Sequence, residues 1–291
     1  MKWHDSVLVE EVKFFFKTLP QDATIIDATL GDGGHSLALL QFFEGKVKII
    51  GIDRDPVMLE RARVRLQDYS ANVSFYQGGF LSVLSQLNQA VHGVLFDFGV
   101  ASFHFDESGR GFTFRADEPL DMRLDPSLHL TAAALIRRLS EPQLREIFRE
   151  FGEERFAAPI ARALKACRGR IDTTGQLAAI VQQAIPGRPF QNARLNPATR
   201  VFQALRIAVN NEIGEIEGGL KSALKILNKG GRVVAISFHS IEDRQVKNIF
   251  RDQKTEGVIE ILTKKPIIPS SAELARNPRS RSAKLRAAQK N

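Results

Sequence analysis

Residues 25–36, with the sequence IIDATLGDGGHS, decide the fold class of this chain. Apolar, β-branched residues lead to Asp27, and glycines at positions 31, 33 and 34 precede a predicted helix. Glycine lets the backbone turn sharply and lets a ligand approach closely. The N–H groups at the start of a helix also favour a negative group. Because such turns are common, this one predicts a ligand site but does not identify the ligand.

Short apolar segments alternate with helical patterns on both sides of this turn. The predicted strands are residues 24–26, 47–52, 73–76 and 91–96, and the predicted helices are residues 36–43, 56–69 and 81–87. Strands that alternate with helices indicate a parallel sheet that helices cover on both faces. The turn at residues 27–34 then lies at the edge of the sheet where open α/β folds bind ligands.

The alternation stops in the middle of the chain. Residues 131–184 show only helical periodicity, and a long helix is predicted to begin at Asn196–Pro197. Its apolar stripe covers residues 209–227 and stops at Gly230–Gly231, after which residues 232–237 read as a strand. We predict a first α/β part at residues 1–108, a helical insert at 109–209, and a second α/β part at 210–291 with a basic C-terminal tail.

Three acids follow three of the predicted strands. Asp27, Asp53 and Asp97 should meet at one edge of a parallel sheet. Asp53 can accept hydrogen bonds from both hydroxyls of a ribose, which NAD and S-adenosylmethionine both contain. Ser36 stands where a dinucleotide fingerprint favours glycine or alanine, and the Gly-Lys-Ser/Thr of a phosphate-binding loop is absent.

The charge of the chain is unevenly distributed. Residues 1–108 carry 9 basic and 14 acidic side chains, a net charge of −5, whereas residues 109–209 carry 16 and 10, a net charge of +6. Residues 276–291 add 6 basic side chains and no acid. This asymmetry favours a polyanionic partner that binds the insert and the tail, through Arg155, Arg162 and Lys165 in the insert.

Composition excludes several classes of protein. Cys167 is the only cysteine, so no internal disulfide can form, and the six scattered histidines predict no metal site. The N-terminal segment breaks its apolar residues with charges, unlike a signal peptide, and no later segment is apolar enough to span a bilayer. We therefore expect a cytoplasmic protein with no membrane partner.

Short ordered motifs occur along nearly the full length of the chain. They are His4–Leu8, Gly31–Ser36, Asp97–Val100, Arg110–Phe114, Pro119–Arg123, Gly152–Arg155, Ser237–Ser240 and Asn277–Arg279. In these motifs the chain resembles the bacterial 16S ribosomal RNA (cytosine-N(4)-)-methyltransferases, the family RsmH or MraW. The resemblance implies a class I, Rossmann-like methyltransferase fold with an all-helical substrate domain inserted. It also implies S-adenosylmethionine as cofactor, a decoding-centre cytosine of 16S rRNA in the small ribosomal subunit as substrate, and a possible homodimer.

The resemblance also assigns site residues. The positions that contact the cofactor in the family correspond to Gly33, Gly34, His35, Asp53, Phe80, Asp97 and His104. The family usually has glutamine at position 104, and Ala101, Phe103 and Glu118 replace its serine, proline and glycine. Asp97 is the candidate catalytic residue, because the 4-amino group of cytosine is a poor nucleophile that needs an acceptor for its N–H bonds.

Other functions stay open on the sequence alone. The alternatives are methyl transfer to another RNA or a small molecule, an NAD-dependent oxidoreductase, or a non-catalytic ribosome assembly factor. Phe103, Phe105, Phe112 and Phe114 could stack on a splayed base, or could anchor their loop to the protein. The apolar stripe at residues 209–227 fits either a dimer interface or an internal core.

Overall fold

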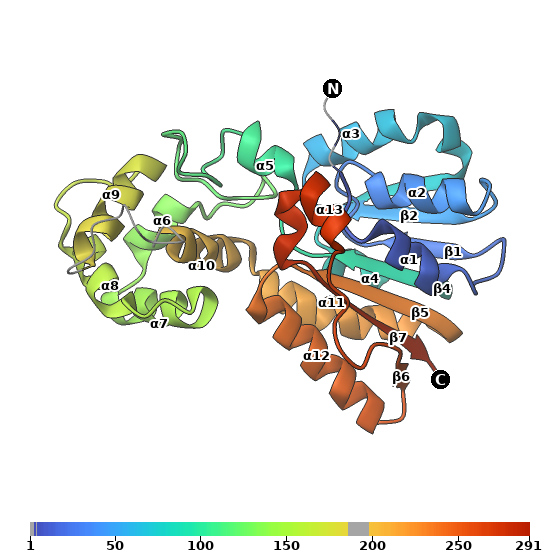
Figure 1. Ribbon diagram of the computed structural model, residues 1–291. Helices are drawn as coiled ribbons and strands as arrows, with labels where there is room; N and C mark the ends of the chain where they lie inside the picture. Colours follow the sequence, from blue (N-terminus) through green and yellow to red (C-terminus); the bar gives the residue numbers. More distant parts are fainter. Residues whose placement is uncertain (1–2, 4, 186–197) are drawn as a thin grey trace. The chain divides into compact units, whose positions relative to one another are not determined.

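The chain divides into two units in the computed structural model, which describes residues 3, 5–185 and 198–291. The first unit combines residues Met1–Val100 with Ile213–Asn291, and the second consists of Ala101–Glu212 (Figure 1). Among the described helices, none has the length and apolar character needed to cross a membrane. Each unit has its own buried residues and is described by itself.

A seven-stranded sheet organises the first unit, with the strand order β3-β2-β1-β4-β5-β7-β6. The strands are β1 (Thr24–Asp27), β2 (Lys48–Asp53), β3 (Val73–Gln77), β4 (Val91–Asp97), β5 (Leu227–Ser237), β6 (Ile259–Ile261) and β7 (Lys284–Lys290). Strands β1 to β5 pair in parallel, and β7 runs antiparallel to both β5 and β6. The predicted α/β fold with a mostly parallel, Rossmann-like sheet is therefore confirmed.

Helices bury both faces of this sheet. Successive strand residues point to opposite faces, so Ile25 and Ile26 belong to different cores although both are fully buried. One core includes α1 (Val9–Phe16), α2 (Gly34–Phe42) and α3 (Pro56–Arg65), and the other includes α4 (Phe80–Gln86), α11 (Glu212–Ile226) and α12 (Ser240–Thr255) (Figure 1). Burial on both faces explains the apolar runs of the central strands.

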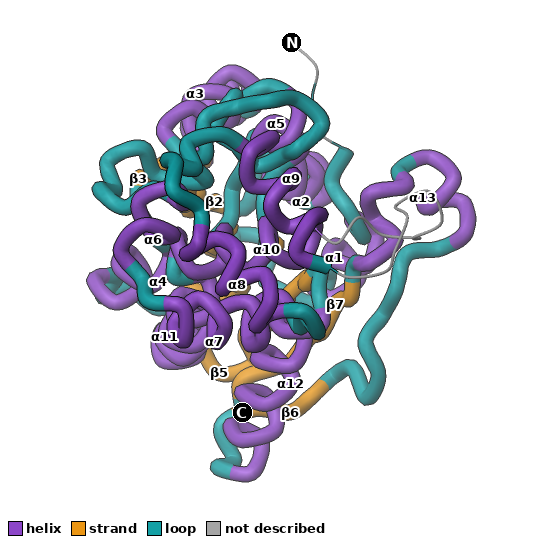
Figure 2. Tube along the Cα trace, turned by 90° about the vertical axis from the view of Figure 1, so that its left-hand side faces the viewer, coloured by secondary structure: helices purple, strands orange, loops and turns teal. Residues whose placement is uncertain are grey.

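The second unit is built from helices in its described residues. They are α5 (Ser102–Asp106), α6 (Ala132–Arg138), α7 (Glu141–Gly152), α8 (Ala157–Ala166), α9 (Thr174–Ala184) and α10 (Ala198–Asn210). Helix α10 contacts α6, α7 and α9, and Figure 2 shows these helices gathered around it. Phe148, Val201 and Leu205 are buried, so this unit has a core of its own.

The long helix predicted before residue 228 is divided in two. Helix α10 ends at Asn210 and α11 begins at Glu212, because Asn211 adopts a left-handed conformation with φ of 48°. The predicted start at Asn196–Pro197 lies outside the described residues. The stripe residues Ile216, Leu220 and Leu224 are buried against the sheet, so they form internal core and not an exposed dimer interface.

Part of the basic C-terminal segment that the sequence predicts as a tail is built into the sheet. Residues 284–290 form β7, which lies between β5 and β6, and Leu285 is fully buried. The guanidinium of Arg286 makes two hydrogen bonds of 2.7 and 3.2 Å to the carboxylate of Asp243. Charge counted along the sequence could not reveal this pairing, because Asp243 lies on another element, α12.

We expect Leu285→Ala to lower the free energy of unfolding by about 2–5 kcal/mol, the usual cost of truncating a buried leucine. Urea denaturation followed by circular dichroism measures the effect. Arg281→Ala changes an exposed residue of the same segment and should stay within about 0.5 kcal/mol of the parent protein. Equal effects of the two substitutions would contradict the buried position of β7.

Candidate functional site

The glycine-rich turn after β1 has a backbone conformation that would be strained for residues other than glycine. Gly31 and Gly33 have φ values of 54° and 84°, in the left-handed region that favours glycine. Gly33 is the residue before helix α2, and a Cβ on Gly34 would lie only 2.1 Å from Oγ of Ser6. The turn therefore needs glycine at these positions, because of its backbone conformation at Gly31 and Gly33 and the close packing of Ser6 at Gly34.

Asp53 ties this turn to the neighbouring strand. Its Oδ2 accepts a 2.8 Å hydrogen bond from the backbone N–H of Gly31, and its Oδ1 accepts one of 2.9 Å from the backbone N–H of Asp55. Both carboxylate oxygens of Asp53 are thus held by backbone N–H groups. The carboxyl ends of β1 and β2 are thus joined through one side chain.

A buried polar cluster lies beside the turn, at the ends of β1 and β4. Asp27, His35 and Ser36 are buried, and the side chain of Asp97 is 19% exposed. The hydroxyl of Ser36 donates a 2.7 Å hydrogen bond to Oδ2 of Asp27. Nε2 of His35 lies 3.4 Å from Oδ2 of Asp97, and the hydroxyl of Thr29 accepts the backbone N–H of Asp97 at 2.6 Å.

The cluster changes the proton affinity of its members. Burial, reinforced by the negative charge of Asp97, raises the pKa of Asp27 to about 6, although His35 and Ser36 oppose this change. Burial lowers the pKa of His35, but Asp97, followed by Asp27, stabilises the protonated ring more strongly. The pKa of His35 is therefore raised above its ordinary value.

Several buried polar atoms of this cluster lack hydrogen-bond partners among the described residues. They are Oδ1 of Asp27, Oδ1 of Asp97 and Nδ1 of His35, while Nε2 of His35 has only its 3.4 Å ion-pair contact with Asp97. Buried polar atoms are normally paired, because an unpaired one costs about 1–3 kcal/mol. Their concentration beside a glycine-rich turn indicates a site for a polar ligand.

Phe80 begins helix α4 at the edge of the same unit. Its ring is largely buried and packs against Phe96 and Phe98, with ring centroids 5.4 and 6.0 Å away. A Cβ on Gly219 would lie 2.5 Å from the Phe80 ring, which shows how closely α11 approaches it. Phe80 is thus an anchored core aromatic that keeps a small exposed edge.

His104 belongs to the second unit, whereas the other six predicted site residues lie in the first. It is buried in α5, and its ring packs edge-on against Phe103 and Phe112, with centroids 5.7 and 5.3 Å away. Phe114 packs in the same manner on Phe202 at 5.0 Å. Phe112 and Phe114 therefore anchor their loop within the helical unit.

Comparison with known proteins identifies the family of this chain. The model of the MraW methylase family matches residues 1–291. The chain belongs to the MraW methylase family. Ribosomal RNA small subunit methyltransferase H of Persephonella marina is 44% identical over 99% of each chain, and that of Acidobacterium capsulatum is 43% identical over 99% of this chain and 98% of its own. The protein of the same name from Leptospira interrogans is 45% identical over 97% of this chain and 87% of its own.

Membership of the MraW methylase family confirms the predicted resemblance and makes this chain a methyltransferase. The family motif Gly31–Ser36 is the turn that carries the buried cluster. The sequence did not reveal that Asp27 and Ser36 share a hydrogen bond with each other inside that cluster. The only sign of this cluster in the sequence was the position of Asp27 as the last residue of a short, apolar strand.

Glu118, which departs from the family pattern, has a clear structural partner. Its Oε2 accepts a 2.8 Å hydrogen bond from the backbone N–H of Gly111, a residue with φ of 77°. The backbone N–H of Glu118 in turn donates to the hydroxyl of Thr174 at 3.0 Å. The glutamate therefore holds its loop against α9 within the helical unit.

We expect Asp27→Asn to stabilise the protein at neutral pH. Because the native carboxyl has a pKa of about 6 against an ordinary value of 3.8, the native state holds an extra proton between these values. Stability therefore falls as the pH rises through this window, and the substitution should recover about 1–3 kcal/mol at pH 7.5.

At pH 4 the stability advantage of Asp27→Asn should largely vanish, because the Asp27 carboxyl of the parent protein is then substantially protonated in both the native and the unfolded state. Denaturant unfolding at several pH values measures both effects. The matched control is Asp22→Asn, which changes an exposed acid just before β1. A gain that is independent of pH would show that the carboxyl of Asp27 is not destabilised by burial.

Proposed function

We propose that this chain transfers a methyl group from S-adenosylmethionine to the exocyclic N4 amine of a cytosine in the decoding region of 16S ribosomal RNA. One observation carries the proposal: the buried atoms without partners gather at the ends of β1 and β4. The curated relatives, which match over nearly their full length, bear the name of small-subunit ribosomal RNA methyltransferases. The site and the family therefore support the same chemistry.

The residues of the turn fit the cofactor. The side chains of Leu66 and Ser6 occupy the space that a Cβ on Gly33 or Gly34 would fill, so these glycines fix the path of the turn that would hold the cofactor. Asp53 is the proposed partner of the ribose hydroxyls, and Phe80 would flank the adenine. His35 and Asp97 complete the proposed binding set in the first unit, and the family resemblance adds His104. When bound, S-adenosylmethionine supplies an electrophilic methyl group.

Asp97 is the proposed acceptor for the substrate amine. Its Oδ1 is buried and has no hydrogen-bond partner among the described residues, while its Oδ2 faces His35. The side chain is partly exposed, and its carboxylate can bind an N–H of the amine and direct the nitrogen lone pair toward the methyl group. The acceleration comes mainly from alignment of the reacting groups. The target base must be single-stranded or splayed to reach this position.

The helical unit is the proposed RNA-binding part, but not through the face that the sequence predicted. Arg155 precedes α8, Arg162 lies 3.7 Å from Glu141, and Lys165 donates hydrogen bonds to the carbonyls of Ile136 and Arg137. These three side chains therefore do not form a free basic stripe, and Lys165 instead holds the end of α6.

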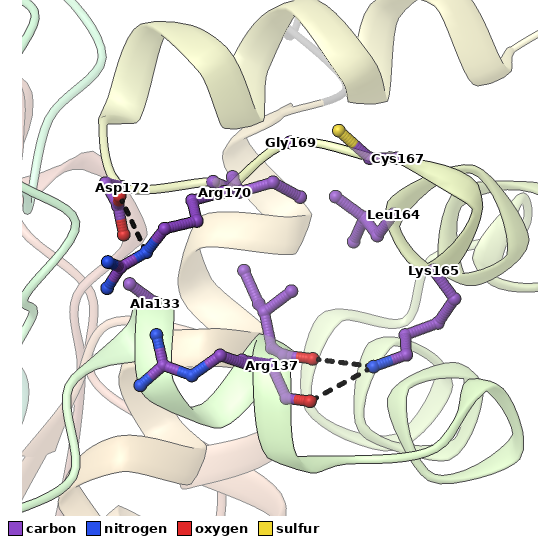
Figure 3. A pocket seen from close by; sticks show the side chains of 10 residues that line it. Ala133, Arg137, Leu164, Lys165, Cys167, Gly169, Arg170 and Asp172 are labelled. Carbon is purple, nitrogen blue, oxygen red and sulfur yellow. Dashed lines mark hydrogen bonds and ion pairs between the residues drawn. The ribbon is translucent and has the colours of Figure 1, made fainter.

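A cavity of about 150 Å³ in the same unit offers a better phosphate-binding site. Figure 3 shows the guanidinium groups of Arg137 and Arg170 on the same side of it, beside an apolar wall that includes Leu164. Arg170 lies 3.3 Å from Asp172, whereas no acid pairs with Arg137 within the part of the chain that the structure describes. We propose that these two arginines bind RNA phosphates.

The proposal places the chain in the cytoplasm, where small ribosomal subunits are available. A homodimer stays a prediction, and light scattering of the purified protein tests it.

Incubation with labelled S-adenosylmethionine and small ribosomal subunits, followed by mapping of the label, tests the function itself. Label on a small molecule alone, tight nicotinamide binding, or RNA binding without transfer would each favour one of the alternative functions.

Asp97→Asn and Asp53→Ala should separate chemistry from binding. Asp97→Asn keeps the shape of the side chain but replaces an acceptor oxygen with a donor, and we expect turnover to fall roughly 100-fold or more. Its affinity for S-adenosylmethionine should fall much less. Asp53→Ala should instead weaken cofactor binding by about 1.5–3 kcal/mol for each charge-assisted hydrogen bond that it removes.

Calorimetry and single-turnover kinetics measure these two quantities. Equal reductions of turnover and affinity in Asp97→Asn would reduce this residue to a binding role.

The double substitution Arg137→Ala and Arg170→Ala should weaken RNA binding and flatten its salt dependence. For every phosphate that the protein no longer neutralises, the slope of log affinity against log salt falls by roughly one unit. The matched control replaces Lys254 and Lys265, two exposed lysines of the first unit. Fluorescence anisotropy with a labelled RNA at several salt concentrations gives the slopes. Equal slopes for the two double variants would place the phosphate-binding residues elsewhere.

A further inference from the structure

His35 interacts with two carboxylates from different strands, the buried Asp27 and the partly buried Asp97. Asp27 ends β1 and Asp97 ends β4, while His35 is the second residue of α2. Nε2 of His35 is 3.4 Å from Oδ2 of Asp97, and the charge of Asp27 also acts on the ring. The opposing charge is Arg65 at the end of α3, whose Nη1 is 2.5 Å from Oδ1 of Asp32.

The ionisation of this cluster follows from its charges. Two such carboxylates on their own would repel each other, and a protonated imidazole beside them offsets that repulsion. Asp27 is held in place from its other side by the hydroxyl of Ser36. The protonated ring therefore binds Asp97 more strongly than a neutral ring would, and the charge of Asp27 helps it to keep its proton.

We propose that His35 is a positioning residue which, in its protonated form, holds the carboxylate of Asp97 in place for the substrate amine. The proposal rests on the proposed function of Asp97 as the acceptor. It gives Asp27 a role as well, because the buried carboxylate stabilises the imidazolium.

A proton relay would require the opposite protonation state. In a relay, the amine N–H breaks, an O–H forms on Asp97, and the proton then passes to a neutral Nε2 of His35. A protonated ring cannot accept it. Positioning by the imidazolium therefore weakens above the pKa of His35, whereas a relay requires the neutral ring and improves there.

The first test measures His35 directly in the ligand-free protein. NMR titration of ¹⁵N-labelled histidine should show His35 with a pKa above 6.5 in the parent chain. Asp27→Asn and Asp97→Asn should each shift this pKa downward. His92 is the internal control, because its Nδ1 accepts the Thr24 N–H at the other end of β1 and β4. A pKa of His35 at or below 6.5, or one that neither substitution moves, would overturn the proposal.

The second test follows single-turnover rates against pH. The parent rate should fall as the pH rises through the titration measured for His35. His35→Gln keeps a neutral N–H donor but loses the charge, so we expect its turnover at saturating cofactor to be at least tenfold slower and to lose this pH dependence. His92→Gln should keep the parent profile. A rate that rises through the His35 titration would support the relay instead.

The two proposals fail in different ways. If Asp97→Asn keeps full turnover, the proposed function of Asp97 is wrong, whatever the state of His35. If Asp97→Asn is inactive but the parent rate is flat through the His35 titration, only the positioning role of His35 is wrong.

Discussion

The hydrogen bond from the Gly31 N–H to the carboxylate of Asp53 is the interaction on which the rest of the site depends. It joins the turn after β1 to the end of β2 and sets the path of the backbone toward α2. Because Gly33 then takes a left-handed conformation, α2 begins with Gly34 and His35. His35 is thereby placed under the turn, beside Asp97, and not on the surface of its helix.

The helical unit is inserted in the sequence between two strands that pair with each other in the sheet. Strands β4 and β5 pair in parallel, with Asp97 opposite Ile236, although the whole of Ala101–Glu212 lies between them in sequence. The buried faces of both strands are completed by helices of the first unit alone. The insert can therefore carry a separate task, which we propose to be RNA recognition, without contributing to the core of the sheet.

Much of the fold could be predicted from the sequence because its central strands are buried on both faces. The predicted strands at residues 24–26, 73–76 and 91–96 differ from β1, β3 and β4 by one residue at the C-terminal end. Strand β7 was missed because lysine and arginine interrupt its apolar residues, and its charges are matched only by a distant acid. The break at Asn211 was missed because apolar periodicity continues across it.

The candidate site was predicted in part, for a related physical reason. The glycine turn and the acids at strand ends can be recognised because each lies at a change of pattern. The coupling of His35 to Asp27 and Asp97 cannot be recognised, because it depends on three elements that meet only after folding.

The order of the chain also affects how folding proceeds. Strand β4 cannot find β5 until the ribosome has synthesised the entire helical unit, so the sheet closes over a very long loop. Each doubling of a loop costs only about 0.6 kcal/mol, but such distant pairing is slow. The helical unit, with its more local contacts, is therefore expected to fold first and shorten the search.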